Sequence, residues 1–556
     1  MRARLTTVSE NPSTSQVDEI RSGYAFEGPS LEFGAAVVDG TAHADATVRI
    51  PLSAMNRHGL VAGATGTGKT KTLQLMAEQL VAQGVPVFLA DIKGDLSGMA
   101  TPGEPNGKIA SRSADVGLPW QPTAYPVEFY ALGGQGTGIP VRASVSTFGP
   151  TLLSKVLGLN DTQESSLGLV FHYADTKGLW LDTIADLRAV VQFLISDEGK
   201  ADLKDLGGLS SSTAGVILRE LVNFSAQGAD LFFGLPEFET TDLLRTAPDG
   251  RGIASMLELP GVQDRPQLFS TFLMWLLADL FHDLPEVGDL DKPKLVFFFD
   301  EAHLLFNDAS EDFLDAIQQT VRMIRSKGVG VFFVTQSPKD VPADVLAQLG
   351  NRVQHALRAF TPDDAKALKA AARTYPNTAY DLEELLTQLG TGEAVITVLS
   401  ENGAPTPVAW TRMRAPQSLM APSAVALLSQ TVAGSPIAPK YVTAIERESA
   451  SEMLGRAEVA RTEAEKAAAL EAENTKVREA AADAAERDRL VAEKQAVKDA
   501  AAARKAQEAS ERKEAAQPGV VESVVRSSAF RSALRSAGTV LGREITRSIF
   551  GTSRKR

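Results

Sequence analysis

Short apolar runs alternate with amphipathic segments through the central part of the chain. Segments such as 71–80, 267–281 and 313–327 carry apolar side chains at helical spacing. Runs that are apolar throughout fit strands buried on both faces, and strands that alternate with helices favour a parallel sheet. The pattern therefore predicts an α/β fold with a mostly parallel sheet. The predicted strands are 59–62, 85–90, 252–259, 294–299, 329–334 and 393–399.

Two parts of the chain depart from this alternation. Residues 146–250 are mainly of helical pattern, including 167–175, 184–195 and 213–224. We interpret them as a helical insertion that separates a first core part, 51–145, from a second, 251–420. Residues 1–50 combine turn residues with short alternating stretches, which predicts a short β-rich segment too small for an independent barrel.

The C-terminal part changes composition. Residues 444–515 consist largely of Ala, Glu, Lys and Arg, and Leu470, Val477, Ala484 and Val491 fall at heptad spacing. This is typical of a long helix or coiled coil; because large apolar residues are few, a lone solvated helix or a disordered tether is an equal alternative.

The tail, 521–556, is basic and amphipathic. It could bind an anionic membrane surface, a protein partner or nucleic acid, or pack back on its own chain.

Composition narrows the function classes. The chain has 556 residues, of which 44% are hydrophobic, and no cysteine, which excludes disulfides, thiolate metal sites and a cysteine nucleophile. A net charge of −13 argues against a simple nucleic-acid-coating protein, although a ring needs basic residues only along its channel. We see neither a signal sequence nor a run long enough to span a bilayer, and expect a cytoplasmic protein.

Residues 63–70 read G-A-T-G-T-G-K-T between a predicted strand and a predicted helix. A strand that turns through glycines into a helix points several backbone N–H groups at one spot, which suits a triphosphate. Lys69 can reach the β- and γ-phosphates of ATP, and the Thr70 hydroxyl can bind Mg²⁺. The predicted nucleotide-binding residues are Gly63, Ala64, Thr65, Gly66, Thr67, Gly68, Lys69, Thr70 and Lys71.

Carboxylates follow the strand 294–299. We expect this strand to lie beside the phosphate-loop strand, with Asp300 bound to Mg²⁺ and Glu301 polarising the attacking water as general base. The alternative is that both carboxylates only cap the following helix. His303 could orient Glu301, or be structural.

Other strand ends add candidates. Gln336 follows the strand 329–334 and is the candidate γ-phosphate sensor. Asp91 and Asp95 follow the strand 85–90 and are expected to line the same cleft without binding the metal directly.

Phosphoryl transfer also needs positive charge on the γ-phosphate, which ring ATPases often supply from the adjacent subunit. The candidates are the arginines that follow the strand 294–299 and its carboxylates, namely Arg322, Arg325, Arg352 and Arg358. Arg352 is the first choice and Arg325 the second, and each could equally be a surface ion-pair partner.

The order of the phosphate loop, Asp91–Asp95, the segment around Asp300, V-T-Q-S at 334–337 and N-R-V at 351–353 resembles the HerA/FtsK group of RecA-like ATPases. The segments 157–163 and 350–362 resemble the YjgR-type HerA-like proteins more narrowly. The resemblance covers roughly residues 25–420 and the short basic tail. It implies a RecA-like core, Mg²⁺-dependent ATP hydrolysis and a hexameric ring.

Two functions stay open from the sequence. One is a hexameric motor that translocates DNA; the other is a P-loop ATPase that acts on protein or membrane-associated partners. A nucleotide-binding structural protein with little turnover is a third, weaker reading. The chain lacks the full N-terminal β-barrel of HerA, so neither the nuclease partner nor DNA follows from the resemblance alone.

Overall fold

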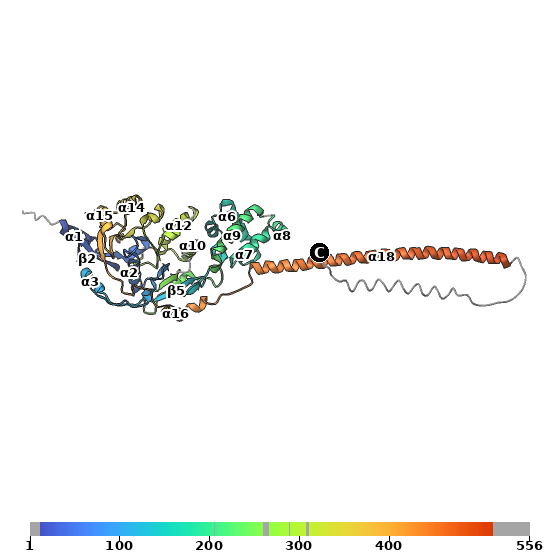
Figure 1. The fold of residues 1–556 in the computed structure, drawn as a ribbon, viewed down its shortest axis with the longest axis horizontal. Helices are drawn as coiled ribbons and strands as arrows, with labels where there is room; N and C mark the ends of the chain where they lie inside the picture. Colours follow the sequence, from blue (N-terminus) through green and yellow to red (C-terminus); the bar gives the residue numbers. More distant parts are fainter. Residues whose placement is uncertain (1–11, 205, 260–265, 289, 307–310, 515–556) are drawn as a thin grey trace, which may run out of the picture. The chain divides into compact units, whose positions relative to one another are not determined.

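The computed structural model describes residues 12–204, 206–259, 266–288, 290–306 and 311–514 (Figure 1). Residues Met1–Val459 form one compact unit, and a second begins at Ala460. The basic tail predicted at 521–556 lies outside the described residues, so its partner stays a prediction.

One sheet of twelve strands organises the first unit, in the order β2-β1-β12-β11-β10-β3-β9-β8-β4-β7-β5-β6. The strands from β10 to β6 are all parallel, and β11, β12, β1 and β2 extend the sheet with antiparallel pairs. The strands are β1 Ser30–Val38, β2 Thr41–Pro51, β3 Gly59–Ala62, β4 Val87–Asp91, β5 Val127–Leu132, β6 Ile139–Val141, β7 Ala254–Glu258, β8 Leu295–Phe299, β9 Val329–Thr335, β10 Asn351–Gln354, β11 Glu393–Thr397 and β12 Ala409–Met413.

All six predicted core strands are present, as β3, β4, β7, β8, β9 and β11. The predicted α/β class with a mostly parallel sheet is confirmed. One expectation about the order is wrong: the acidic strand β8 does not lie beside β3, because β9 pairs with both and separates them. Strand β10 escaped prediction because its sequence, N-R-V-Q, contains a single apolar residue; its position between β3 and β11 makes it a strand.

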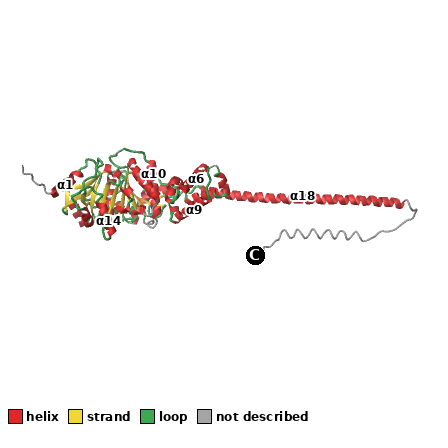
Figure 2. Cartoon of the chain, turned by 90° about the horizontal axis from the view of Figure 1, so that it is seen from above, coloured by secondary structure: helices red, strands yellow, loops and turns green. Residues whose placement is uncertain are grey.

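Helices cover both faces of the sheet (Figure 2). The segment predicted as a helical insertion contains α4 to α9, and α10, α12 and α2 match the other predicted helices. The α-helices are α1 Pro12–Gly23, α2 Lys69–Ala82, α3 Gly107–Val116, α4 Val145–Phe148, α5 Pro150–Val156, α6 Asp161–Lys177, α7 Ile184–Leu194, α8 Asp197–Asp202, α9 Ser211–Ala226, α10 Pro266–Asp283, α11 His303–Phe306, α12 Glu311–Ile324, α13 Ala343–Leu346, α14 Pro362–Ala372, α15 Leu382–Gln388, α16 Val425–Gly434, α17 Ala438–Tyr441 and α18 Ala450–Glu514.

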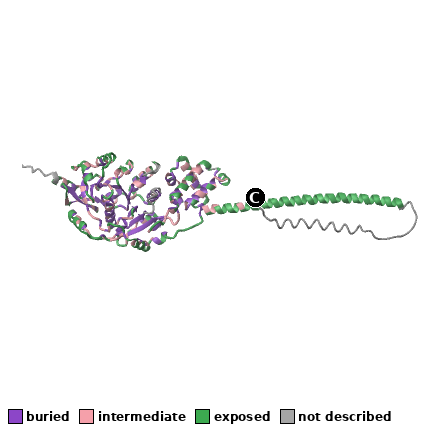
Figure 3. Cartoon of the chain, viewed as in Figure 1, coloured by how far each residue is buried: buried purple, intermediate pink, exposed green. Residues whose placement is uncertain are grey.

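The core strands bury both faces, as Figure 3 shows for the sheet as a whole. In β8, Phe297 and Phe299 pack in one apolar cluster, while Phe298 packs in the cluster on the opposite face. Because successive side chains of a strand point to opposite faces, an uninterrupted apolar run is what a strand between two layers requires. The sheet is thereby held rigidly between two cores.

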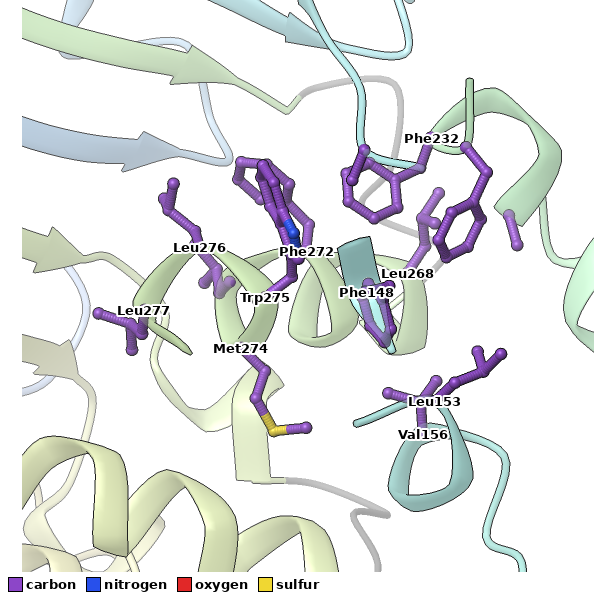
Figure 4. Packing of buried hydrophobic residues seen from close by; sticks show 14 of the residues in the cluster. Phe148, Leu153, Val156, Phe232, Leu268, Phe272, Met274, Trp275, Leu276 and Leu277 are labelled. Atoms are coloured by element: carbon purple, nitrogen blue, oxygen red, sulfur yellow. The ribbon is translucent and has the colours of Figure 1, made fainter. Parts of the chain in front are cut away.

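The first cluster joins the insertion to the sheet. Figure 4 shows Trp275 and Phe272 of α10 beside Phe232, and Phe148 of α4 nearby. The Phe232 ring centroid lies 5.6 Å from those of both Phe272 and Trp275. Such aromatic packing fixes the insertion to the helix that covers this face of the sheet.

The N-terminal segment and the C-terminal arm differ in burial. β1 and β2 belong to the main sheet, with Leu31, Phe33 and Val48 buried. In contrast, the side chains of α18 from position 463 to Lys513 are exposed (Figure 3). The arm predicted at 444–515 is a helix from Ala450 to Glu514, and pairing into a coiled coil stays a prediction. The predicted domain boundaries likewise stay predictions.

Candidate functional site

The carboxyl ends of the parallel strands gather the predicted site residues. Ala62 of β3 is in register with Thr335 of β9, and Phe299 of β8 with Phe333 of β9. The carboxyl ends of these parallel strands therefore bring together the phosphate loop, Gln336 and the Asp300–Glu301 pair. This arrangement, with one strand between the phosphate-loop strand and the acidic strand, is that of a RecA-like core.

The phosphate loop runs from Gly63 to Gly68 and turns into α2. Gly66 and Gly68 have φ of +79° and +121°, a region that side chains other than hydrogen rarely allow. The loop is anchored on both sides: Gly63 N donates to Thr335 O at 3.2 Å, and Ala64 N donates to Ala356 O at 2.8 Å. The loop leads into the N-terminus of α2, where backbone N–H groups favour an anion, and nucleotide binding there stays a prediction.

Lys69 begins α2 and is almost fully buried. Its ammonium donates to Ala64 O at 3.2 Å, so it already lies over the loop. Burial lowers the pKa of Lys69, while the charges of Glu301 and Asp300 oppose that shift. These interactions bring the lysine and the two carboxylates, which are remote in sequence, into one electrostatic site.

His355 follows β10 and lies next to Gly63 of the phosphate loop. Its Nδ1 lies 2.8 Å from Glu393 O, which can only accept, so Nδ1 carries the hydrogen and Nε2 accepts from the Thr72 hydroxyl at 2.8 Å. Burial lowers its pKa to about 4, which keeps the ring neutral. The sequence pattern did not single out His355, because the strand that precedes it, β10, was not predicted either.

Asp300 has one free oxygen. Its Oδ1 accepts from Glu301 N at 2.9 Å, whereas Oδ2 is buried and has no hydrogen-bond partner among the described residues. Burial raises the pKa of Asp300 to about 7, and the neighbouring Glu301 charge adds to the shift. A buried carboxylate oxygen without a partner is costly, and a cation would satisfy it.

Glu301 occupies a strained position with φ of +49°. Its Oε1 accepts from the Lys93 ammonium, and its Oε2 lies 3.3 Å from His303 Nδ1. Burial would raise the pKa of Glu301, but the Lys93 hydrogen bond and charge outweigh burial and lower it. Glu301 is therefore ionised, as a general base must be.

Gln336 lies at the end of β9 and is exposed. Together with Ala64, Thr65, His303 and Arg358 it lines a cavity of about 660 Å³ beside the phosphate loop. This position agrees with a sensor that contacts a bound γ-phosphate, and that role stays a prediction.

Asp91 ends β4 and Asp95 lies in the loop that follows, where its buried Oδ1 has no hydrogen-bond partner among the described residues. Asp91 is buried and its oxygens accept from three backbone N–H groups of the following loop, so it shapes that loop. Burial raises the pKa of Asp91 to about 6. Glu258, the neighbour of Asp91 at the end of β7, was not singled out from the sequence; burial raises its pKa to about 8, aided by the charges of Asp91 and Asp95. Asp91 and Glu258 end the neighbouring strands β4 and β7, and the described residues contain no cluster of three or more metal-ligating side chains.

The candidate arginines lie apart. Arg325 is exposed just before the amino end of β9, whereas the predicted site lies at the carboxyl ends of the parallel strands. Arg352, inside β10, donates to Thr374 Oγ1 at 2.6 Å. Arg358 is exposed and lines the cavity beside the loop. Of these three arginines, Arg358 is the one that lines the cavity beside the phosphate loop; action of Arg352 or Arg325 from an adjacent subunit stays a prediction.

The residues present fit a Mg²⁺-nucleotide. Thr70 follows Lys69 on the first turn of α2, and the partnerless Oδ2 of Asp300 supplies the oxygen chemistry that Mg²⁺ prefers. When bound, Mg²⁺ would neutralise charge that develops on the phosphates.

The mostly parallel α/β fold and the phosphate loop at the carboxyl ends of its strands together define a P-loop α/β protein. The family model "Helicase HerA-like C-terminal" matches residues 37–556, nearly the whole chain. The chain belongs to this HerA-like family.

Two curated relatives are similar over parts of their length. The "DNA double-strand break repair helicase HerA" of Sulfurisphaera tokodaii is 24% identical over 358 residues, 63% of this chain and 64% of that protein. The "Probable helicase MJECL08" of Methanocaldococcus jannaschii is 34% identical over 124 residues, 22% of each. The chain thus spans less than two thirds of the length of these relatives.

Solved structures similar to this chain include the plasmid coupling protein TrwB in complex with an ATP analogue. The identity is 17% and the TM-score is 0.47, and the match covers 72% of this chain and 99% of that one. VirB4 of Thermoanaerobacter pseudethanolicus has 15% identity and a TM-score of 0.45, covering 70% of this chain and 97% of that one.

Proposed function

We propose that this protein hydrolyses ATP with Mg²⁺. The observation that carries the proposal is the meeting of Lys69 with Asp300 and Glu301 at one sheet edge, where Asp300 Oδ2 is buried without a partner. Membership of the HerA-like family supports it. The residues fit the chemistry without rearrangement of the sheet.

Each residue has a distinct task. The phosphate-loop N–H groups and Lys69 bind the β- and γ-phosphates, and Thr70 and Asp300 hold Mg²⁺. Glu301 takes a proton from the attacking water as the γ-phosphorus–oxygen bond to ADP breaks. Gln336 reports whether the γ-phosphate is present.

An ATPase assay with a magnesium titration tests this proposal. Wild-type protein is expected to release phosphate only with Mg²⁺, and Asp300→Ala to lose both activity and Mg²⁺ dependence. Asp344→Ala, an acidic residue of α13, is the control and is expected to retain activity. Phosphate release without Mg²⁺, or full activity of Asp300→Ala, would contradict the proposal.

We further propose that the protein works as a hexamer that translocates DNA. The supporting observations are the HerA-like family and relatives whose names describe helicases, one of them in DNA double-strand break repair. The net charge of −13 does not oppose this, because only residues lining a channel need be basic.

The alternative is an ATPase that acts on protein or membrane-associated partners; the acidic net charge and the basic sequence at 521–556 favour it. Hydrolysis measured with and without duplex DNA, at low and moderate salt, separates the two. Stimulation by DNA that weakens with salt is expected for the motor. No binding of DNA and no stimulation by DNA, together with binding to anionic liposomes, would favour the alternative.

Among the described helices, none combines the length and apolarity needed to cross a bilayer.

A further inference from the structure

The loop after β4 is held in a fixed turn by Asp91. Its Oδ1 accepts from Lys93 N at 3.2 Å and Gly94 N at 2.7 Å, and its Oδ2 accepts from Leu96 N at 2.8 Å. Gly94 has φ of +74°, which completes the turn. A loop whose N–H groups are satisfied by one buried carboxylate presents its remaining side chains in a defined direction.

That direction is toward the acidic strand. Because β4 and β8 are adjacent and parallel, with Ala90 in register with Phe299, the loops that follow them meet. The Lys93 ammonium donates to Glu301 Oε1 across this junction. The Lys93 side chain is 48% exposed and the Glu301 side chain only 8%, so the lysine is the solvent-accessible partner of the pair.

The contact bears on catalysis. A carboxylate that already accepts from an ammonium has one oxygen fewer for a water molecule. The other oxygen of Glu301, Oε2, lies 3.3 Å from His303 Nδ1 and makes no hydrogen bond to the described residues. The charge of Lys93 is close enough to contribute to the lowered pKa of Lys69, after burial as the main cause. A triphosphate bound to the loop would bring a multiply charged anion beside Lys93, whose flexible stem allows it to change partners.

We infer that Lys93 is a positioning residue that holds Glu301 while the site lacks ATP and moves its ammonium to the γ-phosphate when ATP binds, which releases Glu301 to the attacking water. This inference rests on the proposed function of Glu301. Lys93 would then couple recognition of the γ-phosphate to activation of the base. ADP, which lacks that phosphate, would leave the Lys93–Glu301 pair intact.

Nucleotide affinities of full-length variants test the inference. With Mg²⁺ present, Lys93→Met is expected to weaken ATPγS binding about tenfold, because a charge-assisted hydrogen bond to phosphate is lost. ADP binding is expected to change less than about twofold, since ADP makes no such contact. In hydrolysis kcat falls, and Lys93→Arg restores most of both losses.

Lys369→Met is the control, because Lys369 is an exposed lysine of α14 that pairs with Glu383. An equal loss for ATPγS and ADP, or no change for either, would overturn the inference. A structure with Mg²⁺ and ATPγS in which Lys93 still contacts Glu301 would do the same.

The two proposals fail separately. If Glu301→Gln hydrolyses ATP at the wild-type rate, the assignment of the base is wrong, whatever Lys93 does. If Glu301→Gln stops turnover while Lys93→Met leaves the ratio of ATPγS to ADP affinity unchanged, only the Lys93 inference is wrong.

Discussion

Asp91 and Asp300 lie at the ends of neighbouring strands, but their carboxylates make different interactions. Asp91 uses both oxygens on the backbone of its own loop, while Asp300 leaves Oδ2 without a partner. A sequence pattern places both at one edge but does not show which oxygen stays free. That distinction depends on local turns, and it separates the loop-shaping acid from the candidate metal ligand.

Lys69→Ala is expected to weaken ATP binding by about ten- to a hundredfold, because a charge-assisted contact to phosphate is lost. Titration with a fluorescent ATP analogue measures it. Lys108→Ala, an exposed lysine of α3, is the control and is expected to bind like the wild type. Unchanged affinity in Lys69→Ala would remove the lysine from the site.

Glu258 offers a test of the electrostatics of the edge. Its pKa is raised to about 8, so the folded state binds a proton that the unfolded state releases near the ordinary value of 4.5. Stability therefore falls as pH rises from 4.5 toward 8. Glu258→Gln removes this cost, and its thermal unfolding midpoint is expected to exceed that of the wild type by about 2 °C at pH 8. At pH 4.5 the two midpoints are expected to coincide; the same difference at both pH values would contradict the assignment.

At the scale of elements, the parallel sheet was predictable and its order was not. Apolar runs such as that of β8 identify buried strands because both faces need apolar side chains. The pairing of β9 between β3 and β8 is decided by contacts between distant segments, which spacing does not reveal. β10 was missed for a related reason: its strand conformation comes from its neighbours.

The long helix α18 provides an element-scale prediction. A chain that ends after Val459 is expected to keep the thermal unfolding midpoint of the full chain within about 2 °C, because the described side chains beyond that residue are exposed apart from the half-buried Thr462. Differential scanning calorimetry measures both proteins. A drop of more than about 5 °C would show that the arm stabilises the first unit.

At the scale of the whole molecule, the fold brings the phosphate loop, the two carboxylates and the predicted sensor Gln336 of one chain to the same strand ends. Arg352 instead donates to Thr374, and Arg325 precedes β9. A ring could bring either arginine to the site of the next subunit. Sequence reasoning predicted residues that the fold brings to one set of strand ends; residues that another copy would supply depend on an assembly that no pattern within one chain encodes.

If Arg352 acts between subunits, Arg352→Ala is expected to lower kcat by about a thousandfold while ATP still binds. Because Arg352 also bonds to Thr374, the Thr374→Val variant is the control; it removes that hydrogen bond and keeps the arginine. Native mass spectrometry with and without an ATP analogue counts the subunits. A monomer under both conditions, with unchanged kcat in Arg352→Ala, would contradict action from a neighbour.

The central claim is that Lys69 and the carboxylates of Asp300 and Glu301 act on one Mg²⁺-ATP. Glu301→Gln tests it most directly, since the amide keeps the shape of the side chain but cannot take a proton. ATP affinity and turnover are measured on the same sample, with Glu258→Gln as the matched variant at the next-but-one strand of the same edge. The account predicts that Glu301→Gln binds ATP at least as tightly as the wild type and hydrolyses it at least about a hundredfold more slowly. Turnover equal to that of the wild type would contradict it.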